Sequence, residues 1–252
     1  APLTLGIDQG WPIWALACLG AFPFVGAAFV YWLRRRMRSG KTPLVELSLF
    51  SKSSFAIGNA LALLFYANNA ALFVALPIFV QLGLGRSALV SGLLFGPLAL
   101  AFSLTSTTVG RLTARVGHRL IAIGCILLLA AYASLAVVAL SIDAQTSVWA
   151  VVPSVVLTGI GMGFVQPTIN YRTLEHVEPR EIGSASGVLN TSFEVGYALG
   201  SVLGGAISLS APRQGFLAVL CLSSVLIALI LIMDRVSSTD PMANLFCSPR
   251  KR

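Results

Sequence analysis

Charged residues are scarce in this sequence of 252 residues, because Lys, Arg, Asp and Glu together make up only 10% of it. A soluble globular domain carries about 25% charged and about 45 to 50% apolar residues, whereas this chain is 56% hydrophobic with a mean hydropathy of +0.86. It therefore lacks the polar surface that a soluble protein presents to water, and its hydrophobicity excludes a disordered tail. We expect an integral membrane protein whose main partner is the lipid bilayer.

Cysteine and histidine are also few, and neither is spaced for chemistry. The four cysteines stand singly along the chain, without the paired spacing of a metal or disulfide framework. The two histidines, His118 and His176, fall in separate predicted loops, and no motif places a nucleophile or metal ligand beside either. We therefore expect neither an enzyme nor a metal or cofactor site.

Long uncharged runs divide the chain into predicted membrane spans. A span takes roughly 20 apolar residues, and its backbone groups must bond within the segment, which predicts helices rather than open strands. The alternation typical of barrel strands is absent. The seven predicted spans are residues 11–33, 53–85, 87–110, 120–142, 144–171, 182–212 and 214–233. The first is not a signal peptide, because its basic cluster follows it.

Basic residues predict the orientation of these spans, since Lys and Arg are kept in cytoplasmic loops. All but two of the 17 basic residues follow the first, third, fifth or seventh span, and only Arg86 and Arg213 lie on the other side. We expect a multi-pass protein of the cell membrane, plasma or inner, with its N-terminus outside and its C-terminus in the cytoplasm. The net charge of +8 reflects this topology, and no basic stripe with stacking aromatics indicates a nucleic-acid partner.

Glu194 is the one ionisable side chain deep inside an uncharged run. A carboxylate at membrane depth is costly and is a functional candidate for that reason. Asn190, Glu194, Tyr197 and Ser201 recur at helical spacing along one stripe. Glu194 is therefore our candidate for proton coupling or substrate binding. The alternative is a structural carboxylate held by bonds between helices, or one that reaches back to the cytoplasmic side.

Amide and phenol side chains in the predicted spans are candidates for lining a cavity. Such groups also commonly bridge membrane helices, so a packing role stays open for each of them. The cavity-lining candidates are Asn59, Tyr66, Asn69, Gln166, Asn170, Asn190 and Tyr197.

Small residues at regular spacing predict close contacts between helices. In the span 144–171, glycines followed by Pro167 also predict a break or bend, and such interrupted helices mark moving or binding elements in transporters. The helix-packing candidates are Gly159, Gly163, Pro167, Gly196, Gly200 and Gly204.

The segment 110–119, between the third and fourth spans, predicts a tight turn with three arginines at the inner surface. We interpret it as a cytoplasmic gate motif, in the same compartment as the acidic residues Glu175, Glu178 and Glu181. Exposed ion pairs contribute only about 0 to 1 kcal/mol each, so simple topology signalling is the alternative role of any single arginine. The gate candidates are Gly110, Arg111, Arg115, Gly117 and Arg119.

These motifs resemble the major facilitator superfamily, specifically its fourteen-helix drug:proton antiporter family of multidrug and antibiotic exporters. Residues 110–119 are similar to the superfamily's Gly-x-Leu-Ala-Asp-Arg-x-Gly-Arg-Arg motif, although Ala114 stands at the acidic position. The stretches 159–167, 177–179 and 185–191 are similar to that family's last helices. Family exporters often carry an amide where this chain has Glu194.

The resemblance implies how the chain is divided. Residues 11–33 would be an inserted helix, and residues 53–234 the six-helix C-terminal lobe of the major facilitator fold. The remaining parts would be an extracellular segment 1–10, a cytoplasmic basic loop 34–52 and a cytoplasmic tail 235–252. Because the sequence begins without Met and soon reaches a span, we expect a fragment whose N-terminal six-helix lobe is missing.

The resemblance also implies a function: proton-coupled efflux of drugs, antibiotics or other small amphipathic organic molecules by alternating access. A proton gradient would supply the energy, without a cofactor. The residues alone permit several substrate classes and do not favour export over uptake. The alternatives are a structural membrane protein or a seven-helix receptor. Against a retinal-binding receptor, no lysine lies in the last span, and long signalling loops are absent.

Overall fold

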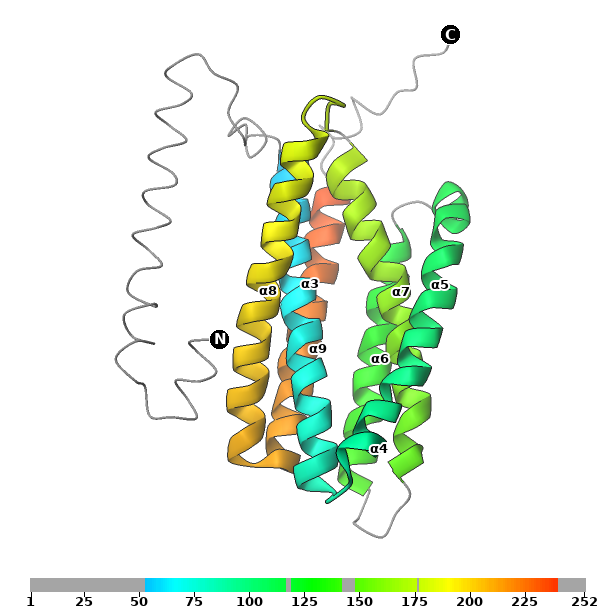
Figure 1. The fold of residues 1–252 in the computed structure, drawn as a ribbon. Coiled ribbons are helices and arrows are strands. Elements are labelled where there is room, and N and C mark those ends of the chain that lie inside the picture. Colours follow the sequence, from blue (N-terminus) through cyan, green and yellow to red (C-terminus); the bar gives the residue numbers. More distant parts are fainter. Residues whose placement is uncertain (1–52, 117–118, 142–147, 176, 240–252) are drawn as a thin grey trace, which may run out of the picture.

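The computed structural model describes residues 53–116, 119–141, 148–175 and 177–239 (Figure 1). The predicted segments 1–10, 11–33 and 34–52 lie outside the described residues, as do Gly117 and the tail after residue 239. The side chains of Arg111 and Arg115 lie outside the description as well.

The described chain is a bundle of long helices. The elements are α3 (Ser53–Ile78) with its π-helical extension η2 (Phe79–Gly83), α4 (Ala88–Leu93), α5 (Phe95–Val116), α6 (Arg119–Ser141), the 3₁₀ turn η3 (Val148–Val151), α7 (Val152–Glu175), α8 (Ile182–Ser210) and α9 (Pro212–Thr239). Within the described ranges, six helical segments are long and apolar enough to cross a membrane. They coincide with the six predicted spans after residue 52, which confirms the all-α membrane fold.

Two differences from the predicted boundaries have a common cause. Residues 110–116, predicted as part of a tight turn, form the last two turns of α5. The helix α7 runs through Pro167 to Glu175 without a break, which was one of the two predicted outcomes, a break or a bend. A charge marks where a span meets water, and a proline marks where the helix loses one hydrogen bond. Neither obliges the helix to end there.

The helices pack as two groups of three, which Figure 1 shows side by side. In one group α3 lies against both α8 and α9, and in the other α7 lies against both α5 and α6. Contacts of α3 with α7 and of α6 with α9 join the groups. This arrangement makes α3 and α7 the central helices and leaves α5 and α8 the least buried of the spans.

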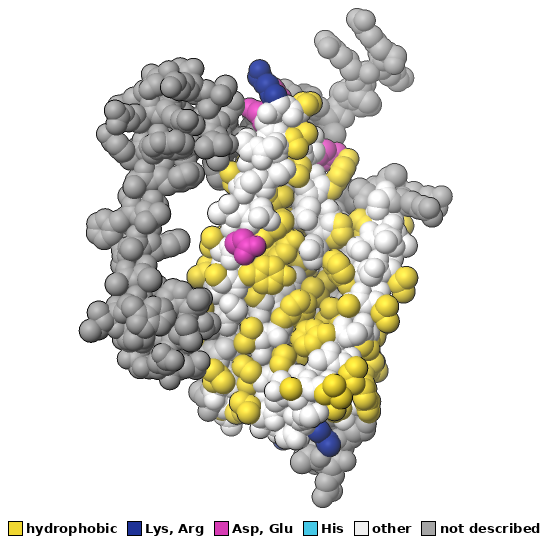
Figure 2. Space-filling model, viewed as in Figure 1, with side chains coloured by type: hydrophobic (Ala, Val, Ile, Leu, Met, Phe, Trp, Pro, Cys, Tyr) yellow, Lys and Arg dark blue, Asp and Glu magenta, His cyan; other side chains and the backbone are white. Residues whose placement is uncertain are grey.

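The interior between the helices is apolar and well filled. Phe79 and Phe216 stack with ring centroids 4.6 Å apart, and Leu128 and Tyr132 of α6 are fully buried. Large apolar side chains also cover the outside, for example Leu100 and Leu104 of α5. Figure 2 shows such side chains spread along the visible face, with most of the visible charged groups near its ends. An apolar exterior of this kind suits a bundle surrounded by lipid.

Candidate functional site

Glu194 lies on the outward side of α8, near the middle of the span. Twelve residues separate it from the start of the helix at Ile182, a rise of roughly 18 Å at 1.5 Å per residue, within a hydrocarbon core of about 30 Å. Its side chain is exposed, and no ion pair involves it among the described residues. The carboxylate therefore stands open at membrane depth.

The two sides of α8 differ in character. Asn190, Glu194 and Tyr197 are exposed along one side, with Ser201 half-buried at its end. On the other side lie buried glycines that pack against α3, so that a Cβ added at either Gly196 or Gly204 would come within 2.6 Å of a carbonyl oxygen of α3. Gly200 between them fits still more closely, against the backbone of Ala67. The stripe of polar residues consequently faces away from the lobe's own core.

Tyr66 connects three helices beside this polar stripe. Its hydroxyl accepts a hydrogen bond from Nε2 of Gln166 on α7, at 2.9 Å. Its ring stacks on Phe193 of α8, with centroids 4.0 Å apart, and meets the ring of Tyr197 at 5.3 Å. The side chain of Asn170 also lies beside Tyr66. The structure thus brings four cavity-lining candidates together next to Glu194.

Two other amide candidates lie apart from this network. Asn59 bridges α3 and α8: its Oδ1 accepts from the Ser192 hydroxyl at 3.0 Å, while its Nδ2 donates to the Phe55 carbonyl at 2.9 Å. Asn69 is fully buried, and neither atom of its amide has a hydrogen-bond partner among the described residues. The neighbouring Asn68, which was not a candidate, donates to the Tyr132 hydroxyl at 2.7 Å.

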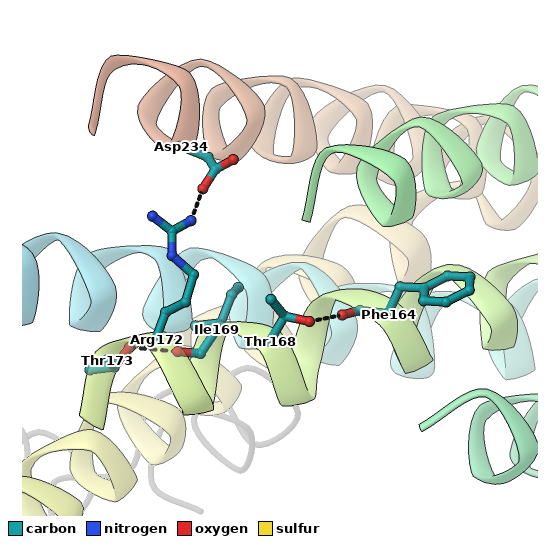
Figure 3. Close-up of polar contacts among 6 residues, drawn as sticks. All are labelled: Phe164, Thr168, Ile169, Arg172, Thr173 and Asp234. Atoms are coloured by element: carbon teal, nitrogen blue, oxygen red, sulfur yellow. Dashed lines mark hydrogen bonds and ion pairs between the residues drawn. The ribbon is translucent and has the colours of Figure 1, made fainter. Parts of the chain in front are cut away.

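The glycines of α7 let α5 approach closely. Gly163 faces Thr105, whose Cβ would lie 2.7 Å from an added Cβ, and Gly159 faces the carbonyl of Leu98. Beyond them Pro167 removes one backbone donor, and the Thr168 hydroxyl donates to the Phe164 carbonyl at 2.6 Å (Figure 3). The helix is continuous through Pro167, so of the predicted break or bend, the break does not occur.

An ion pair that was not predicted joins α7 to α9. Arg172 donates through Nη1 to Oδ1 of Asp234, as Figure 3 shows. The Asp234 carboxylate is almost fully buried, while Arg172 is partly exposed. The sequence assigned Arg172 to topology alone, although each residue directly follows an uncharged run on the same predicted side of the membrane. That shared position was the signal that these two charges could meet.

The gate candidates are only partly described. Gly110 and Arg119 are exposed at facing ends of α5 and α6. Among the acidic residues predicted in the same compartment, Glu178 pairs with Arg180 at 3.0 Å, and Glu175 accepts a weak bond from the Tyr171 hydroxyl at 3.4 Å. In the part of the chain that the structure describes, His, Cys, Asp and Glu form no group that could hold a metal.

Comparison with known proteins gives a consistent set of relatives. The profile of a family described as the Major Facilitator Superfamily matches residues 2–201 and 60–244. The chain is 32% identical over 212 residues to the "Probable actinorhodin transporter" of Streptomyces coelicolor. The aligned region covers 81% of this chain and 36% of that protein.

Two further relatives carry names that refer to drug resistance. The chain is 25% identical over 203 residues to the "Tetracycline resistance determinant" of Streptomyces rimosus, covering 79% of this chain and 57% of that protein. It is 28% identical over 188 residues to the "Multidrug resistance protein Stp" of Mycobacterium tuberculosis, covering 73% and 33% respectively. The chain therefore spans between about a third and somewhat over half of the length of these relatives.

Proposed function

The chain belongs to the major facilitator superfamily, and on that premise we propose that it forms one lobe of a proton-coupled exporter of small amphipathic organic molecules. The names of its relatives, an actinorhodin transporter and two resistance proteins, support export of antibiotic-like substrates. A transporter of this kind needs no cofactor, because a proton gradient across the cell membrane supplies the energy.

The observation that carries this proposal is the open carboxylate of Glu194. A charged group facing hydrocarbon at mid-span costs several kcal/mol, and the described bundle supplies it with no counter-charge. The polar side of α8 must therefore face water or another part of the protein. A water-filled cavity between two lobes meets this requirement, and the network of Tyr66 and Gln166 supplies further polar groups to its wall.

A carboxylate in such a cavity can exchange protons for substrate. When the cavity opens outward, Glu194 takes up a proton as the substrate leaves; when the cavity opens inward, loss of that proton restores the negative charge. Alternating access of this kind moves one helix bundle against another around a site near the midplane. Because the chain spans only part of its relatives, we propose that a preceding six-helix lobe forms the opposite wall.

Several contacts suit a lobe that moves as a unit. The glycine seam, formed by Gly196, Gly200 and Gly204, fixes α8 to α3, and the Arg172–Asp234 pair fixes the end of α7 to α9. The first contact holds two helices of one group together, and the ion pair joins that group to the other, so the groups cannot slide far past each other without breaking the pair. We propose the orientation given by the basic residues, with the Arg172 end of α7 in the cytoplasm.

Transport by the full-length protein tests the proposal. In proteoliposomes with an imposed pH gradient, the wild type should drive uptake or release of a fluorescent amphipathic drug, and a protonophore should abolish it. Glu194→Gln keeps the size and polarity of the side chain but removes its proton site, so we expect gradient-driven transport to fall at least about tenfold. The control is Asp143→Asn, which neutralises a carboxylate between the fourth and fifth predicted spans, on the opposite predicted side of the membrane from the gate motif. Full transport by Glu194→Gln would refute the role of this residue.

A further inference from the structure

Asn69 of α3 is an amide that the bundle encloses without bonding it. Its side chain is 0% exposed, and neither Nδ2 nor Oδ1 has a hydrogen-bond partner among the described residues. Asn59 of the same helix differs, because its Oδ1 accepts from Ser192 and its Nδ2 donates to the Phe55 carbonyl. Buried polar atoms in folded proteins are nearly always bonded, either to protein or to ordered water. Asn69 therefore needs a partner other than a residue of the described bundle.

The neighbours of Asn69 on its own helix are apolar or already bonded. A helical side chain leans toward the N-terminus of its helix, over the residues three and four positions earlier. These are Tyr66, whose hydroxyl is bonded to α7, and Phe65, which is 0% exposed. One turn further along the helix lie the apolar residues Leu72 and Phe73. The helix α3 thus supplies no new donor or acceptor for this amide.

The side of α3 that carries Asn69 is turned toward α7. Gly58 packs so closely against Thr173 of α7 that an added Cβ would lie 2.3 Å from the threonine hydroxyl oxygen. Asn69 follows Gly58 by three helical turns and points within roughly 20° of the same direction, at 100° per residue. The bond between Tyr66 and Gln166 lies one turn away along the same contact. Because α3 and α7 belong to different groups of three helices, the amide lies where the two groups meet.

This contact is also the least extensive that α3 makes with another spanning helix of its own or the neighbouring group. The helix α3 touches α7 less than it touches α8 or α9. A small ligand is therefore easier to place between α3 and α7 than along the tight glycine seam with α8.

The chemistry of an amide selects a small neutral ligand. Nδ2 of Asn69 offers two hydrogens and Oδ1 accepts, so a ligand that both donates and accepts can serve both atoms. A metal cation prefers a shell of oxygen ligands that includes carboxylates, and the uncharged runs that form α3 and α7 contain no Asp or Glu. Water meets these conditions, since a buried water typically bonds about three polar groups of the protein.

We propose that Asn69 binds an ordered water molecule between α3 and α7, enclosed by the bundle and separate from the open side of α8. The water bonds the Asn69 amide and backbone carbonyls of α7, whose oxygens each keep a lone pair beyond the helical bond. It thereby joins the two groups of helices where their direct packing is least extensive. This inference is independent of the proposed function, because it requires neither a substrate nor a proton.

Radiolytic footprinting of the full-length protein in detergent tests the site. An X-ray pulse splits water into hydroxyl radicals, which oxidise the nearest side chains, so a bound water marks a buried residue that bulk water does not reach. Phe65 is the reporter, because the Asn69 side chain leans over it. Phe79 of the neighbouring element η2 is the matched control, since it is equally buried but stacks on Phe216. We expect Phe65 to be oxidised at least about fivefold faster than Phe79, because only Phe65 lies beside a bound water.

Variants separate the amide from the space that it occupies. Asn69→Ala enlarges the space but leaves it apolar, and apolar cavities stay dry, while Asn69→Leu fills the space. Both variants should lower the oxidation of Phe65 to the level of Phe79. The control is Asn59→Ala, which removes an amide that is already bonded to Ser192, and it should leave the oxidation of Phe65 unchanged.

The origin of the oxygen gives a second measurement on the wild type. The protein is mixed briefly with water that carries a heavy oxygen isotope, and the pulse follows. An enclosed water exchanges slowly, so the oxidised Phe65 should carry less of the heavy isotope than the oxidised Tyr171, which is exposed.

Three results would overturn the site. They are equal oxidation of Phe65 and Phe79 in the wild type, unchanged oxidation of Phe65 in Asn69→Ala, and equal isotope content at Phe65 and Tyr171. The two measurements on the wild type remain decisive where a variant does not fold.

Discussion

At the scale of single residues, Arg172 and Asp234 show how a charge at the end of a span can serve packing. Asp234 is buried, and the guanidinium of Arg172 reaches its carboxylate from α7. A buried ion pair adds little net stability compared with apolar packing, but removing one partner leaves a desolvated charge behind. The carboxylate is the more buried partner, so removing the arginine and removing the aspartate should cost different amounts of stability.

We predict that Arg172→Gln destabilises the protein more than Asp234→Asn. The first variant leaves a buried carboxylate without its guanidinium, and we expect a loss of about 1 to 3 kcal/mol, below the value for fully buried pairs because Arg172 is partly exposed. The second leaves a neutral amide beside an arginine that can turn toward water. Thermal unfolding in detergent measures both. The double variant should be less destabilised than the sum of the single variants, and strict additivity would show that the two residues are not coupled.

At the scale of elements, α8 combines two tasks on one helix. Its glycine side brings it close to α3, and its polar side carries Asn190, Glu194 and Tyr197. Close approach at the seam holds the ring of Tyr66 against Phe193 and Tyr197. The geometry of the candidate site therefore depends on residues that no ligand touches.

Substitution of the seam glycines tests this dependence. At Gly200 an added methyl group would press on the backbone of Ala67, whereas Gly187 of the same helix has open space around it. We predict that Gly200→Ala lowers stability by about 1 to 3 kcal/mol through overpacking. Gly187→Ala should leave stability unchanged or raise it slightly, because alanine favours helix more than glycine does. Thermal unfolding of the two variants provides the comparison, and equal midpoints would contradict the close contact.

The same helices show which elements the sequence could predict. The thickness of the bilayer sets the length of a span, and the cost of burying charge keeps the span uncharged. Both constraints apply to each segment by itself, so the spacing of charges located all six described spans. The end of a helix depends instead on local hydrogen bonding where the span meets water. The helix α5 accordingly continues past Gly110, the last residue of the uncharged run. The uninterrupted course of α7 at Pro167 likewise is not fixed by the composition of the run, because a proline removes one backbone donor without obliging the helix to end.

At the scale of the whole molecule, sequence patterns predicted faces of helices but not their partners. Helical spacing placed Asn190, Glu194 and Tyr197 on one stripe, because that requires only 100° per residue. The bond between Gln166 and Tyr66 joins positions 100 residues apart, and the pair of Arg172 with Asp234 joins positions 62 apart. Such pairings depend on how six helices are arranged in the bundle, which a pattern along one helix does not encode.

The open side of α8 leads to a prediction about the isolated chain. A single lobe provides one wall for Glu194, whereas alternating access requires a second wall that closes over the substrate first on one side and then on the other. We predict that the 252-residue chain alone, reconstituted with a pH gradient and a fluorescent amphipathic drug, gives no gradient-dependent transport. A protein that also contains the proposed preceding six-helix lobe, measured in parallel, should transport, and co-reconstitution of the chain with that lobe should restore part of this activity. Saturable, protonophore-sensitive transport by the isolated chain would show instead that this lobe forms a complete pathway, for example by pairing with a second copy of itself.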